Sequence, residues 1–144
     1  MTDMVNSEAF DRLNVPFLAE MIDEIRACGM KSIYYFCGNP EGKWDSILGL
    51  GMDALALEES KKTFSINIED VAERVKGRCA LLGNLDAIAV LQRGSSEDLK
   101  TEVERQVGAG RKNGGRFIMS TGSPVTPETP VSRVHEYCDL VRGA

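Results

Sequence analysis

The chain has 144 residues, and its 17 Lys and Arg against 22 Asp and Glu give a formal net charge of −5. This length is typical of one domain, and 42% hydrophobic against 27% charged residues is enough for a folded core, which excludes intrinsic disorder. The acidic balance excludes a nucleic-acid-binding surface, which needs clustered positive charge. No apolar run approaches the roughly 20 residues of a membrane span, and the first residues lack a signal-peptide pattern. We therefore expect a cytoplasmic protein with neither nucleic-acid nor membrane partners.

Helix and strand signals alternate from the start of the chain. Hydrophobic residues at three- and four-residue spacing predict a helix over 7–28, which Pro16 kinks or restarts and Gly29 ends. A β-branched and aromatic run over 31–36 is typical of a buried strand. The next expected elements are a helix over 44–50 and a strand over 53–57.

The middle of the chain repeats this order. Asn67 is the predicted N-cap of a helix that ends at Gly77, and a third strand is expected over 79–82. Ser95 and Asp98 have the spacing of a capping box, which predicts the start of another helix.

The last part of the chain contains two less regular segments. The apolar segment 87–91 is compatible with either a helix or a strand. The glycine-rich and basic stretch 108–116 is interpreted as a loop or helix cap, with anion binding as the alternative. A fourth strand is predicted over 117–119, and Thr129 as N-cap with Pro130 at the first helical position predicts a final helix.

Four strands that alternate with helices predict an α/β fold built from βα units around a parallel sheet. The strand centres, at Ile33, Leu55, Leu81 and Ile118, are 22, 26 and 37 residues apart, which leaves room for right-handed helical crossovers. In parallel sheets, ligands bind where the strands end, at their carboxyl termini.

Polar loops follow all four predicted strands. They span 36–40, 57–61, 83–86 and 120–124. Because the carboxyl ends of parallel strands lie at one edge of the sheet, we expect these loops to form one ligand site. The alternative is that their Gly, Asn, Asp and Pro residues are ordinary turn formers.

Two of these loops contain side chains suited to catalysis. Cys37 is either a thiolate nucleophile or metal ligand, or an inert buried thiol. Glu58 and Glu59 follow the second strand and offer a general base, although with Lys61 and Lys62 they could also form a solvated charge run.

Three segments together resemble the uroporphyrinogen decarboxylase superfamily. They are FCGN at 36–39, LLGNLDAI at 81–88 and GRFIMSTGSPVTPETP at 115–130, preceded by a family-like helix at 7–25. The resemblance implies a single domain over 1–144 that corresponds to the second half of a (β/α)8 TIM barrel, strands five to eight. A whole barrel needs at least about 200 residues. We therefore expect a homodimer, or a partner chain that completes the barrel. The alternative is a truncated or excised segment with no independent role.

The residues of these motifs resemble the family's methyltransferase-like branch more than its porphyrin-pathway decarboxylases. That branch passes a methyl group between a corrinoid or methylated small molecule and an acceptor, and holds zinc through a His-x-Cys pair and a second Cys. The matching positions here are Tyr35, Cys37 and Ser123. Uroporphyrinogen decarboxylation, in porphyrin biosynthesis, is one alternative; in that branch a His occupies the position of Ser123. The second alternative is a non-catalytic binding or accessory module, so the sequence leaves open whether the chain is an enzyme.

The expected site combines catalytic and substrate-binding side chains from all four loops. The predicted catalytic residues are Cys37, also the candidate zinc ligand, and Glu58. The predicted contacts to a small-molecule substrate are Asn39, Asn84, Asp86, Ser120 and Ser123.

Overall fold

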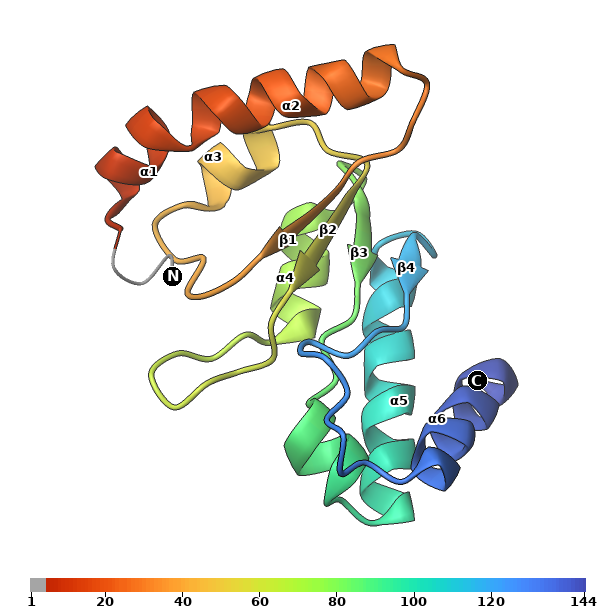
Figure 1. The fold of residues 1–144 in the computed structure, drawn as a ribbon. Helices are drawn as coiled ribbons and strands as arrows, with labels where there is room; N and C mark the ends of the chain where they lie inside the picture. Colours follow the sequence, from red (N-terminus) through yellow and green to blue (C-terminus); the bar gives the residue numbers. More distant parts are fainter. Residues whose placement is uncertain (1–4) are drawn as a thin grey trace.

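Four short parallel strands form the centre of the structure, a computed structural model that describes residues 5–144 (Figure 1). The strands are β1 (Ile33–Phe36), β2 (Ala54–Leu57), β3 (Ala80–Leu82) and β4 (Phe117–Ile118). They lie in the sheet in the order β1-β2-β3-β4, the same as their order in the chain. The predicted parallel sheet of four strands alternating with helices is confirmed. Residues 1–4, where the sequence lacks a signal-peptide pattern, lie outside the described residues.

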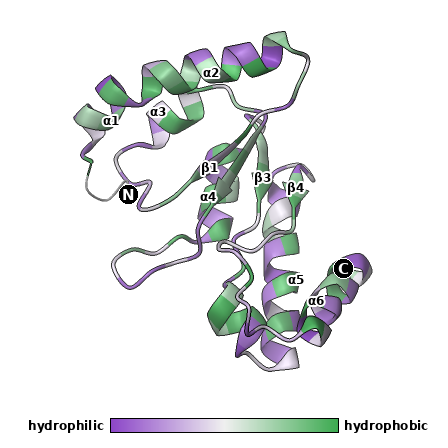
Figure 2. Ribbon diagram, viewed as in Figure 1, coloured by the Kyte–Doolittle hydropathy of each residue, from purple (hydrophilic) through white to green (hydrophobic). Residues whose placement is uncertain are grey.

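Helices precede and connect the strands. They are α1 (Ser7–Leu13), α2 (Val15–Ala27), α3 (Trp44–Gly49), α4 (Ile68–Val75), the π-helix η2 (Ala87–Gln92), α5 (Ser96–Lys112) and α6 (Val131–Gly143). Hydrophobic and hydrophilic residues alternate along α2 and α5 in Figure 2, as expected of helices that have one face against a core. No helix in the described part of the chain is long and apolar enough to cross a membrane.

The predicted helix boundaries agree with the structure, with one small shift. The helix predicted over 7–28 is divided at Asn14, and Pro16 lies in the first turn of α2. The Asn67 side chain caps α4, and both hydrogen bonds of the Ser95 capping box are formed. The final helix begins at Val131, with Pro130 rather than Thr129 as its N-cap.

The glycine-rich stretch 108–116 contains the end of a helix and its cap rather than a loop, so the helix-cap interpretation is the one that the structure supports. Helix α5 continues through it to Lys112, and only Gly114 and Gly115, with φ of 66° and 76°, form the turn that follows. Within the helix, a Cβ on Gly110 would lie 2.5 Å from the Cβ of Phe117 in β4. Glycine at this position therefore lets the helix pack closely against the strand.

Two glycines in α5, Gly108 and Gly110, are two residues apart and are expected to respond oppositely to alanine. Gly110→Ala should lower the free energy of unfolding by about 1–3 kcal/mol, because its methyl group collides with Phe117. Gly108→Ala, which meets no atom within 4 Å, should raise it by up to about 1 kcal/mol through helix propensity. Urea denaturation of both variants tests this, and equal effects would contradict the close packing.

One face of the sheet is buried under the helices. Phe36, Leu55, Leu57 and Leu81 are fully or almost fully buried there, in a core shared with α1 to α4. A smaller core holds η2, α5 and α6 together around Leu85, Leu91, Leu99 and Val103. The sequential strand order accounts for this one-sided burial, because every crossover returns on the same side of the sheet.

The other face of the sheet is bare, which corrects the prediction that 31–36 is a buried strand. Ile33 and Tyr35 of β1 are 59% and 44% exposed, and Ile118 of β4 is 52% exposed. The register pairs Tyr35 with Ala56 and Ile118 with Leu82, so all five side chains share this face. We call this side of the sheet, which no helix of the described residues covers, the bare face; the small Ala54 and Ala56 of β2 also lie on it and are themselves buried. β1 and β4 also end the sheet, and each leaves one edge without a strand partner among the described residues.

Candidate functional site

The loops after the four strands meet at one edge of the sheet, as predicted for parallel strands. Beyond β3 and β4 the chain stays paired, because Leu85 N donates to Ser120 O at 3.1 Å and Gly122 N donates to Leu85 O at 2.9 Å. This pairing brings residues 120–123 beside the loop 83–86. The carboxyl edge of the sheet is therefore an ordered surface.

The carboxylate of Glu59 is the centre of the polar groups at this edge. Glu59 is only 7% exposed, and the Ser123 hydroxyl lies 2.8 Å from each of its carboxylate oxygens. Lys61 Nζ donates to Glu59 Oε1 at 2.5 Å and to Ser123 Oγ at 3.2 Å. We call these three residues the Glu59 cluster. Partial burial disfavours the charge of Lys61, but the hydrogen bond to Glu59 raises its pKa overall, so the ammonium stays protonated.

Gly122 allows the two loops of this cluster to approach each other. A Cβ at Gly122 would collide with the backbone nitrogen of Glu59 and with its carboxylate. The Tyr35 hydroxyl donates to the carbonyl oxygen of Gly122 at 2.6 Å, which ties the end of β1 to the same loop. Partial burial, together with the nearby Cys37 and the two carboxylates, raises the pKa of Tyr35. Tyr35 is therefore a neutral donor.

Glu58 and Asn84 support the cluster from the neighbouring loops. Glu58 Oε2 accepts a hydrogen bond from Gly38 N at 3.0 Å, beside Cys37, and Asn84 Nδ2 donates to the Glu58 carbonyl at 3.1 Å. Asn84 N donates in turn to the side chain of Gln106 at 3.2 Å, and both residues are buried. Helix α5 thus fixes the backbone next to Glu59 through two buried amides.

The other predicted substrate contacts bond within their own loops. Asn39 Oδ1 accepts from Glu41 N at 3.1 Å. Asp86 caps η2 by accepting from two backbone nitrogens at 2.9 and 2.7 Å. The Ser120 hydroxyl donates to the Thr121 carbonyl at 3.1 Å. Of the predicted set, the structure brings Ser123 into the Glu59 cluster. The sequence predicts Glu59 as a candidate base, but it predicts neither the pairing of Glu59 and Lys61 with Ser123 nor the bond from Tyr35 to Gly122.

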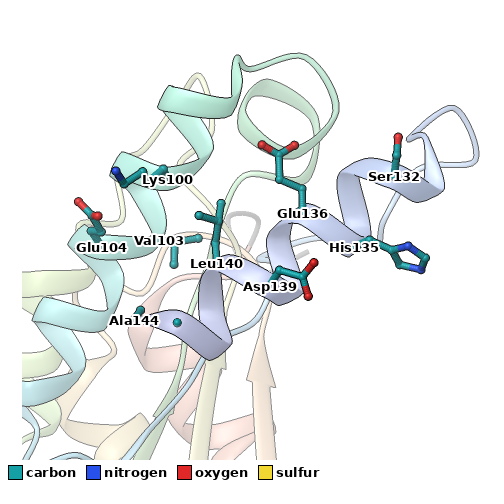
Figure 3. Close-up of a pocket in the computed structure, with 10 residues that line it drawn as sticks. Lys100, Val103, Glu104, Ser132, His135, Glu136, Asp139, Leu140 and Ala144 are labelled. Carbon is teal, nitrogen blue, oxygen red and sulfur yellow. The ribbon is translucent and has the colours of Figure 1, made fainter.

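A hollow of about 330 Å³ lies beside the cluster on the bare face. It is lined by Ile33, Tyr35, Ala56 and Leu82 and by residues 120–124. A larger hollow of about 670 Å³ lies elsewhere, between α5 and α6 (Figure 3). His135 lines that second hollow, and its ring points away from Lys100 and Glu104 in the figure. Of these two hollows, the first combines an apolar wall with the polar edge of the sheet.

The residues at the three matched metal positions do not fit a zinc centre. Tyr35 and Ser123 supply hydroxyl oxygens that are already hydrogen-bonded to Gly122 and Glu59, and Cys37 alone supplies sulfur. Zinc in proteins is held mainly by thiolate, imidazole and carboxylate ligands. Within residues 5–144 no three His, Cys, Asp or Glu side chains are grouped to hold a metal ion.

Comparison with known proteins identifies relatives along the whole chain. The family model described as "Uroporphyrinogen decarboxylase (URO-D)" matches residues 1–144. A methylcobamide:CoM methyltransferase MtbA from Methanosarcina mazei is 20% identical over 143 residues, which is 98% of this chain and 38% of that protein. The MtbA of Methanosarcina acetivorans is 21% identical over 145 residues, with the same shares covered.

A solved structure shows the same fold. It is a methyltransferase from Methanosarcina mazei, with a TM-score of 0.81 and 18% identity over 99% of this chain and 39% of the other. The chain thus spans about two fifths of the length of the relatives it matches.

Proposed function

The chain belongs to the uroporphyrinogen decarboxylase family, and from that we propose that it forms the second half of a (β/α)8 barrel in a methyltransferase-like protein. Four strands in sequential order, with helices on one side, are the arrangement of half such a barrel. The other four βα units come from a second copy of this chain or from a complementary half. The bare face would then point into the closed barrel.

The observation that carries the proposed site is the Glu59 cluster beside the apolar hollow of the bare face. Small-molecule sites combine an apolar wall with a few fixed polar groups. Here Ile33 and Leu82 belong to the wall, while the ammonium of Lys61 provides a donor for a polar substrate beside Ser123. A methylated small molecule or the methyl-bearing face of a corrinoid is the proposed ligand.

Cys37 and Glu58 have the proposed catalytic roles, with no step through zinc. The Glu58 carboxylate accepts a hydrogen bond from the backbone of Gly38, next to Cys37, which supports its proposed role as the proton acceptor. In the transfer, an acceptor thiol gives its proton to Glu58 while its sulfur bonds the methyl carbon. The donor leaves with the electron pair of the broken bond. Cys37 is either that acceptor or a contact to it.

Replacement of Cys37 tests the reaction. With methylcobalamin and a small thiol as probes, Cys37→Ala should lower the rate of methylcorrinoid loss at least about tenfold, because it removes the thiol at the reacting edge. The matched control is Cys28→Ala, at an exposed position after α2. Absorbance of the corrinoid reports the rate, and equal rates in both variants would refute the role of Cys37.

A non-catalytic binding module is the second candidate, favoured by the hydrogen bonds that engage Tyr35 and Ser123. In that case methylcobalamin should raise the melting temperature of the protein without any turnover, because a ligand that binds only the folded state stabilises it. Turnover would exclude this candidate. Conversion of a porphyrinogen instead of methylcobalamin would favour the decarboxylase alternative.

A further inference from the structure

Lys43 is a buried cation without a carboxylate partner in the described part of the chain. The residue is 6% exposed and lies in the loop between β1 and α3. Its ammonium donates to the carbonyl oxygen of Asn39 at 3.5 Å, a long hydrogen bond, and it forms no ion pair with a described residue. Buried lysines are nearly always paired, because removing an ammonium group from water is costly.

Glu41 and Asp45 are the acidic residues nearest to Lys43 in the sequence, and neither forms an ion pair with it. Asp45 is exposed, and Glu41 is engaged elsewhere. Glu41 Oε1 accepts from the indole nitrogen of Trp44 at 2.9 Å and lies 3.9 Å from Arg74. It therefore does not neutralise Lys43. The charge of this lysine is available to a group from outside the described chain.

A hollow of about 360 Å³ lies next to Lys43. Its lining residues are Asn39, Lys43, Thr63 and Phe64, and we call it the Lys43 hollow. It lies between the loops after β1 and β2, at the same edge of the sheet as the Glu59 cluster. Thr63 is exposed, so its hydroxyl is accessible as a donor, and the ring of Phe64 gives an apolar wall. Lys62, next to Thr63 in the chain, is exposed and is not among the residues that line the hollow.

We infer that the Lys43 hollow binds the anionic group of a small molecule, namely a carboxylate, sulfonate or phosphate. Such a group would pair with the ammonium of Lys43 and accept a hydrogen bond from Thr63, interactions that are stronger than neutral hydrogen bonds. The inference deepens the proposed function, on which it rests for the identity of the ligand as substrate. The substrate would then be a small molecule that carries its methyl group at one end and an acidic group at the other.

Titration with simple anions tests the inference directly. Sodium acetate, methanesulfonate and inorganic phosphate are added separately at constant ionic strength, and binding is followed by calorimetry and by the melting temperature. At least one of the three should raise the melting temperature of the wild-type chain. Lys43→Met should weaken its binding at least about tenfold. Lys62→Met, two positions from Phe64 and exposed, is the matched control and should bind as the wild type does.

A second readout does not depend on binding. Without any anion, Lys43→Met should melt no lower than the wild type, because it removes a buried charge that has no internal partner. A large drop in its melting temperature would indicate a structural ion pair and overturn the inference. Thr63→Val, at an exposed position, should keep the stability and weaken anion binding, and equal binding in all four proteins would also overturn it.

The anion assay separates this inference from the proposed reaction. Turnover of methylcobalamin without any binding of the three anions would refute the Lys43 hollow alone. Anion binding that depends on Lys43, without turnover, would support the hollow and refute methyl transfer.

Discussion

The purified chain is expected to form a dimer, and Ile33→Asp combined with Ile118→Asp is expected to make it monomeric. These two side chains are more than half exposed on the bare face, at opposite ends of the sheet. Burying a large aliphatic side chain contributes about 1.5–3 kcal/mol, so two aspartates should weaken association at least about a hundredfold. Native mass spectrometry across a concentration series measures this directly.

The control is Val131→Asp, because Val131 is 70% exposed on α6, away from the sheet. It should leave the dimer unchanged. A wild-type chain that stays monomeric at micromolar concentration and binds no hydrophobic dye would contradict the interface. In that case the bare face would not bind a second apolar surface, and the half-barrel proposal, which rests on the need to cover this face, would fail.

The strands were predictable from the sequence because each is a short local run of apolar residues. All four were found within two residues of their predicted ends. Which face of β1 is covered was not predictable, because the cover depends on crossovers that are distant in the chain. Ile33 and Tyr35 have the composition of a buried strand, yet they lie on the side that no helix covers.

Segment 87–91 shows a different limit of sequence analysis. Its apolar residues have no clear period, and the structure places them in a π-helical turn in which Leu91 N donates to Asp86 O at 3.0 Å. This spacing of five residues is rare. Asp86 caps the start of this segment, a role that the prediction of Asp86 as a substrate contact did not include.

The choice between Glu58 and Glu59 illustrates why the site was only partly predictable. Alternation along β2 places Ala54 and Ala56 on the bare face, so continuing the pattern selects Glu58 as the inward carboxylate. The strand ends at Leu57, however, and the close approach of Gly122 turns Glu59 toward Ser123 instead. The spacing of Glu59 and Lys61 was the available signal, but their partner Ser123 is 64 residues away.

Restoring the missing donors should create a zinc site where the wild type has none of comparable affinity. Tyr35 bonds the carbonyl next to Ser123 and also contacts Cys37, so it lies near both of the other positions. Tyr35→His with Ser123→Cys would supply one imidazole and two thiolates, the donors that zinc prefers. We expect the double variant to bind zinc at least about a thousandfold more tightly than the wild type.

Competition with a chromogenic chelator measures the zinc affinity, and elemental analysis measures the metal that remains bound after purification. Adding Cys37→Ala to the double variant should remove most of the gain, because only two strong donors would remain. Stoichiometric, tightly bound zinc in the wild type would refute the misfit argued from Tyr35 and Ser123. No gain in the double variant would instead mean that the three positions do not converge. A gain in zinc affinity in the double variant would mean that the wild type lacks only the donor atoms, whereas no gain would mean that it also lacks their geometry. The Glu59 cluster accounts for a missing donor, because Ser123 already binds Glu59.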